Sequence, residues 1–104
     1  MTTSARHNEI VRGKILHYLG LIYPQSATLL LLQGELDLLG YPLNMEELNF
    51  HVAYLAEKEL LVIGTGKGPR TVRSIPLIKI TAKGIDYRDG RLPLDDGIYL
   101  EPAK

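Results

Sequence analysis

The stretch that decides the fold runs from Leu43 to Thr81 and reads LNMEELNFHVAYLAEKELLVIGTGKGPRTVRSIPLIKIT. Residues 44–60 carry apolar side chains at helical spacing, and Asn44 followed by Glu47 is a variant of the capping box. Residues 61–63 are typical of a strand, 64–70 form a glycine-rich basic tip, and 72–80 are typical of a return strand. This stretch therefore predicts an amphipathic helix that leads directly into a basic β-hairpin.

Two further helices are predicted upstream of this stretch. Apolar residues recur at helical spacing over residues 8–22, and Pro24 ends that helix. Ser26 is the candidate N-cap of a second helix, from Ala27 to about Leu39. Its leucines exceed what one buried face needs, so this helix is either very buried or shared with a partner. The predicted fold class is α+β, with three helices, a β-hairpin wing and a short C-terminal element that begins near Thr81.

The length of 104 residues predicts one folded domain. We expect the domain to occupy residues 1–87. Residues 88–104 are rich in turn-forming residues, but they also contain several apolar side chains. This tail is therefore expected to pack on the domain or on a second subunit.

Composition limits the chemistry that the chain can perform. It has no cysteine, which excludes a disulfide framework, a thiolate zinc site and a thiol nucleophile. Its three histidines lack metal-ligand spacing, and no serine lies in a pattern with a histidine and an acid. The longest apolar run is far shorter than the ~20 residues of a membrane span, and the N-terminus lacks the apolar core of a signal peptide. We therefore expect a cytoplasmic protein that is not an enzyme and has no cofactor or metal.

Charge is distributed unevenly although its formal sum is zero. Residues 64–83 carry five cations and no acid, whereas residues 24–63 carry one cation and six acids. The predicted hairpin is thus the positive pole of the chain, and the predicted middle helices are acidic. Such an asymmetry can steer an anion toward one face of a neutral protein.

Residues 48–84 resemble the winged helix-turn-helix superfamily of transcription regulators. The likeness rests on Tyr54-Leu55 followed by Leu60-Leu61, and on Ile80-Thr81-Ala-Lys-Gly84. Over nearly the whole chain there is a closer likeness to small winged-helix proteins of Mu-like phages and prophages. It is carried by the Arg12, Ile15, Leu16 pattern, by Leu39-Gly40, and by Gly90-Arg91, Gly97-Ile98 and Pro102.

The resemblance implies DNA binding in a regulatory or accessory role of phage type. One residue departs from the superfamily pattern, because Glu59 stands where a glycine usually ends the helix in a left-handed conformation. Either the helix continues differently at Glu59, or the chain absorbs the strain of a positive φ there.

A winged helix places its third helix in the major groove and its wing cations on the DNA backbone. In the wing, Lys67, Arg70 and Arg73 are the candidate phosphate contacts, although they could equally be solubilising charges on a turn. In the recognition helix the candidates are Asn44, Asn49 and His51. Asn44 could instead serve only as a helix cap. Asn49 and His51 could simply face solvent.

We predict that the chain is a small, dimeric, DNA-binding transcriptional regulator with double-stranded DNA as its partner. Glu46 and Glu47 at the start of the recognition helix would repel phosphate. The alternative is therefore a winged-helix adaptor that binds another protein and not DNA.

Overall fold

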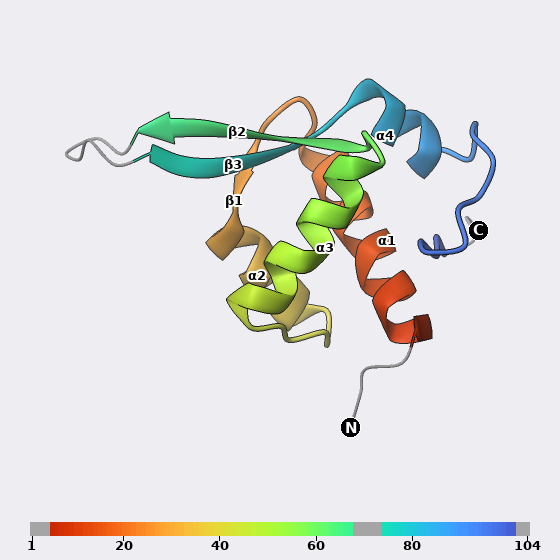
Figure 1. Cartoon of the computed structure of the whole chain (residues 1–104), viewed down its shortest axis with the longest axis horizontal. Coiled ribbons are helices and arrows are strands. Elements are labelled where there is room, and N and C mark those ends of the chain that lie inside the picture. The colour runs from red at the N-terminus through yellow and green to blue at the C-terminus, as the bar shows by residue number, and fades with distance from the viewer. Residues whose placement is uncertain (1–4, 68–73, 102–104) are drawn as a thin grey trace.

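The computed structural model describes residues 5–67 and 74–101, and within this part the chain is α+β. Four helices accompany one small antiparallel sheet (Figure 1). In chain order the elements are α1 (Ala5–Ile22), β1 (Ala27–Thr28), α2 (Leu29–Leu38), α3 (Met45–Glu57), β2 (Leu61–Lys67), β3 (Ser74–Ile80) and α4 (Ala82–Arg88).

The second helix begins later than predicted, and the prediction of Ser26 as its cap is wrong. Ala27 and Thr28 instead form a short strand that pairs with Ile78 and Leu77 of β3. Thr28 then caps α2, because its hydroxyl oxygen accepts a hydrogen bond from the Leu31 amide at 3.1 Å. A long-range strand pairing has therefore moved the start of the helix by two residues.

The capping box at the start of α3 is confirmed. The Asn44 side chain accepts from the Glu47 amide at 2.8 Å, and the Glu47 carboxylate accepts from the Asn44 amide at 2.9 Å. The helix ends at Glu57 with Lys58 as its C-cap, and Glu59 follows at a φ of 66°. The chain thus adopts the left-handed turn that the superfamily pattern gives to glycine, and it does so with a glutamate.

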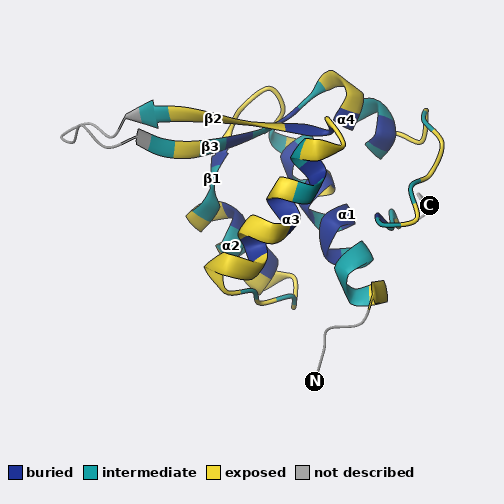
Figure 2. Cartoon of the chain, in the orientation of Figure 1, coloured by how far each residue is buried: buried dark blue, intermediate teal, exposed yellow. Residues whose placement is uncertain are grey.

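The sheet has the order β1-β3-β2, and the β2–β3 register runs from Leu61 opposite Ile80 to Lys67 opposite Ser74. The base of this pair is buried, whereas its outer part extends away from the helices and is largely exposed (Figures 1 and 2). A proline within a sheet is ordinarily confined to an edge strand, yet Pro76 lies in β3, which is the central strand. Its position is accommodated because β1 pairs only with residues 77 and 78, one step beyond the proline.

One core joins all these elements. Its buried apolar residues are Val11, Ile15, Leu16 and Leu19 of α1; Leu32 and Leu36 of α2; Leu48, Val52 and Leu55 of α3; and Ala27, Leu60, Leu61, Ile78, Ile80, Tyr87 and Ile98 elsewhere.

Thr81 caps α4 through its hydroxyl, which accepts from the Gly84 amide at 3.0 Å. The C-terminal tail returns to α1, where the Tyr99 amide donates to the Glu9 carbonyl at 3.0 Å.

Candidate nucleic-acid interface

The outward face of α3 is open to solvent, but its chemistry is mixed. Its exposed residues are Met45, Glu46, Glu47, Asn49, Phe50, Ala53 and Glu57. Three are acids, one is an amide and the rest are apolar, so the helix itself presents no cation. Asn49 is exposed, as expected. The Asn44 side-chain oxygen is engaged by the capping box described above, which is the alternative role considered for it.

His51 is not an exposed residue of this face, and the expectation that it faces outward is wrong. It retains 3 % of its accessible surface and lies against α1, where its Nδ1 accepts a hydrogen bond from Arg12 Nε at 3.1 Å. Burial, with the nearby Arg12 charge adding to it, lowers the pKa of His51 to about 4. The imidazole is therefore neutral at pH 7 and acts as an acceptor inside the protein.

The sequence held a signal for this burial. His51 follows Leu48 by three residues and precedes Leu55 by four, so it lies on the inward stripe of α3. Arg12 precedes Ile15 by three residues and Leu16 by four, so it lies on the inward stripe of α1. Two polar residues on facing apolar stripes indicate a buried polar pair.

Arg12 makes buried contacts that the sequence analysis did not predict. It retains 8 % of its accessible surface, and its guanidinium carbon lies 3.7 Å from the centre of the Tyr54 ring. One terminal nitrogen donates to the Gly97 carbonyl at 3.0 Å. Arg12 thus joins α1, α3 and the C-terminal tail, and it supports α3 from behind.

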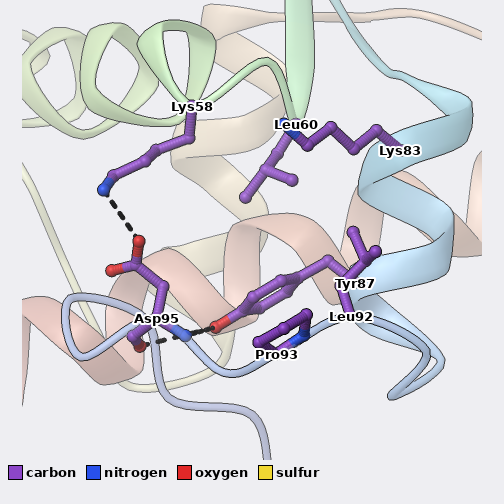
Figure 3. Close-up of a pocket in the computed structure, with 7 residues that line it drawn as sticks. All are labelled: Lys58, Leu60, Lys83, Tyr87, Leu92, Pro93 and Asp95. Carbon is purple, nitrogen blue, oxygen red and sulfur yellow. Dashed lines mark hydrogen bonds and ion pairs between the residues drawn. The ribbon is translucent and has the colours of Figure 1, made fainter.

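A second cluster ties the end of α3 to the tail (Figure 3). Lys58 Nζ lies 2.7 Å from a carboxylate oxygen of Asp95, and the Gly97 amide and Tyr54 hydroxyl donate to the other oxygen at 2.8 and 3.2 Å. These donors, the Lys58 bond first, lower the pKa of the Asp95 carboxyl, and the same pair raises the pKa of Lys58. Lys58 is therefore held by the tail and is not a free cation at the end of α3.

The tail cluster borders a small cavity of about 200 Å³. Its walls come from the end of α3, from α4 and from the tail, and they include Leu60, Tyr87, Leu92 and Pro93 (Figure 3). The Tyr87 hydroxyl accepts from the Asp95 amide at 2.9 Å and donates to the Ile98 carbonyl at 3.2 Å. The polar groups at this cavity thus serve the packing of the tail.

The candidate wing cations fall at the edge of the described residues or outside them. The backbone of Lys67 is the last described position of β2, while its side chain, Arg70 and Arg73 lie outside the described residues. The two cations nearer the body have partners. Lys79 Nζ lies 5.8 Å from the centre of the Tyr23 ring, and Lys83 Nζ lies 3.3 Å from the Glu59 carboxylate.

Comparison of the chain with protein-family models, with curated proteins and with solved structures finds no match. Within residues 5–67 and 74–101, no group of three histidine or acidic side chains is arranged to hold a metal ion. In the same part of the chain, no helix combines the length and the apolar composition that crossing a membrane would require.

Proposed function

We propose that this chain is a small protein of the winged helix-turn-helix type that binds double-stranded DNA. In this proposal α3 enters the major groove and the β2–β3 hairpin lies on the adjacent backbone. The observation that carries it is the shape of the molecule: a two-stranded ribbon projects from the helical body directly after a solvent-exposed helix (Figures 1 and 2). A helix or a two-stranded ribbon is what fits a DNA groove.

The charges support a division of roles between the two elements. Lys67, Arg70 and Arg73 lie in a stretch without any acid, so the hairpin would supply affinity through phosphate contacts. On α3, the exposed Asn49 is the candidate best placed to read a base, because an asparagine side chain can pair with adenine. The buried His51 cannot take this role without leaving Arg12.

The resemblance to winged-helix proteins of Mu-like phages supports a role in transcription regulation or an accessory role in a phage or prophage. A symmetric dimer would suit such a role, since it would present two copies of α3 to half-sites about one helical turn apart.

Single substitutions on α3 test whether this helix lies on DNA. With α3 in the groove, Glu46→Gln removes a charge that repels phosphate, so we expect binding to any duplex to tighten about two- to fivefold at low salt. Asn49→Ala should reduce the preference for a selected sequence by about tenfold or more. Asp96→Asn, on the exposed tail, is the control that removes a charge elsewhere. DNA affinities that neither α3 variant alters would contradict the placement of α3.

A second function, a protein-interaction module, is favoured by the composition of the helices. From Ile15 through Glu57 the chain has no lysine or arginine, and Phe50 on the outward face of α3 remains 61 % exposed. An apolar, acidic face of this kind suits a partner with a basic amphipathic segment. Binding to bulk DNA separates the two functions, because an adaptor of this kind has no salt-sensitive affinity for it.

A further inference from the structure

The outward face of α2 exposes large apolar side chains to solvent. Leu30, Leu31 and Leu38 retain 71 %, 52 % and 85 % of their accessible surface. They surround Gly34, whose position would leave an added Cβ with no atom within 4 Å. We call these four residues the α2 stripe, and their spacing of three and four places them on one side of the helix.

Three features of this helix are unfavourable in an isolated monomer. The leucines of the stripe face water. Gly34 weakens a helix relative to alanine at a place where the fold leaves room for a larger side chain. Asp37 lies in the last turn, where a negative charge opposes the helix dipole, and no basic residue offsets it there.

We propose that the α2 stripe binds the α2 stripe of a second copy of this chain, with the two helices antiparallel and crossing at Gly34. This arrangement relieves all three features together. The absence of a Cβ at Gly34 lets the two backbones approach closely, as small residues do at other helix crossings. Leu38 then packs against the partner's Leu30, and this contact occurs twice because the interface is symmetric.

Charge complementarity selects the antiparallel orientation. In that orientation Asp37 lies beside the partner's Leu31, in the first turn of the partner helix, where backbone amides lack intrahelical acceptors and the dipole is positive. A parallel pair would instead bring the two Asp37 carboxylates to the same end of the interface. The acid that opposes its own helix dipole thus complements the dipole of the partner.

The contact is small, so the dimer should be weak. A ten-residue helix is about 15 Å long, and one helix pair covers less than the ~800 Å² per subunit of a standard interface. We expect dissociation in the micromolar range, measurable by sedimentation velocity from about 1 µM to about 1 mM chain. This inference does not rest on DNA binding, and the measurement contains no DNA, so the two proposals can fail separately.

Three variants test the interface by sedimentation. Leu38→Glu, at a largely exposed position, should weaken dimerisation more than about tenfold, whereas its thermal melt at a chain concentration that keeps both proteins monomeric should fall only slightly, because the added acid opposes the helix dipole. Asp37→Lys should also weaken the dimer, yet raise the melting temperature of the monomer because it now suits its own helix dipole. Leu94→Glu is the matched control, since Leu94 is a similarly exposed leucine in the tail.

Disulfide trapping tests the orientation, because the chain has no cysteine of its own. With antiparallel helices Gly34→Cys should cross-link to itself, whereas Leu30→Cys should not, since its two copies lie about 12 Å apart along the axes. A mixture of Leu30→Cys and Leu38→Cys should form the heterodimer in preference to either homodimer. Leu94→Cys measures the yield from random collision.

Any one of three results would overturn the proposal. The first is a wild-type chain that sediments as a monomer at every concentration. The second is a dimer that Leu38→Glu leaves intact. The third is self-linking of Leu30→Cys as efficient as that of Gly34→Cys, which would show that the helices are not antiparallel.

Discussion

Acidification should destabilise this protein through one buried imidazole. His51 accepts the Arg12 Nε–H, and its pKa is lowered from 6.5 to about 4 by burial first, then by Arg12 and His7, against a raising effect of Glu47. Protonating it inside the fold would remove the acceptor and place two cations in contact. The folded state therefore excludes a proton that the unfolded chain binds freely below pH 6.5.

The sign and size follow from linkage. Because the folded pKa lies below the unfolded one, the unfolded chain binds more protons between the two values, so stability falls as pH falls through this window. A lowering of the His51 pKa from 6.5 to about 4 corresponds to a loss of about 3 kcal/mol in the free energy of unfolding once His51 is protonated in both the folded and the unfolded chain. At about pH 5 the loss relative to neutral pH is about 2 kcal/mol.

Urea unfolding from about pH 7.5 down to about pH 4 measures this loss. His51→Asn is the decisive variant, since the asparagine oxygen can accept from Arg12 near the position of Nδ1 but does not titrate. The difference in stability between wild type and this variant should shrink or reverse as pH falls. His17→Asn, at an exposed position, controls for the removal of an imidazole. A wild-type curve parallel to that of His51→Asn would refute the reasoning.

Four further substitutions test the packing of the fold by urea unfolding at neutral pH. A Cβ on Gly13 would overlap the Tyr99 carbonyl oxygen of the tail, so Gly13→Ala should lower the free energy of unfolding by about 2 kcal/mol or more. A Cβ on Gly34 meets no atom, so Gly34→Ala should raise the free energy of unfolding of the monomer by about 1 kcal/mol. Equal effects of the two substitutions would contradict the tail contact. Glu59→Gly keeps the φ of 66° but removes the Cβ that is strained there, so it should gain up to about 1 kcal/mol, and a loss would show that the turn is not strained. Tyr87→Phe removes the hydroxyl that accepts from the Asp95 amide and should cost about 1 kcal/mol; unchanged hydrogen exchange in the tail would contradict its role there.

The features that the sequence predicted well are those that neighbouring residues determine. The capping box of Asn44 and Glu47 needs only three residues of spacing, and it is present as expected. The strand after α3 follows from an equally local signal, as does the short element that begins near Thr81, which the structure shows to be helix α4. The left-handed turn at Glu59 was one of two possibilities that the sequence left open.

The features that the sequence did not predict depend on residues that lie far away along the chain. Ala27 and Thr28 become a strand only because β3 lies beside them, and this pairing displaced the predicted cap at Ser26. His51 is buried because Arg12, 39 residues away, supplies its hydrogen-bond donor. An α-helical wheel places His51 on the inward stripe, but it does not reveal what would satisfy its polar atoms.

The central claim is that this chain binds DNA through its hairpin, and the salt dependence of that binding tests it most directly. The measurement is fluorescence anisotropy on a random duplex over a range of salt, with wild type beside a variant in which Lys67, Arg70 and Arg73 are all alanine. We expect salt-sensitive binding by wild type. In the variant, the slope of the logarithm of the binding constant against the logarithm of the salt concentration should be flatter by about two to three, because each lost phosphate contact lowers it by about one. No binding at low salt, or an unchanged slope in the variant, would contradict the claim and favour the protein-interaction module.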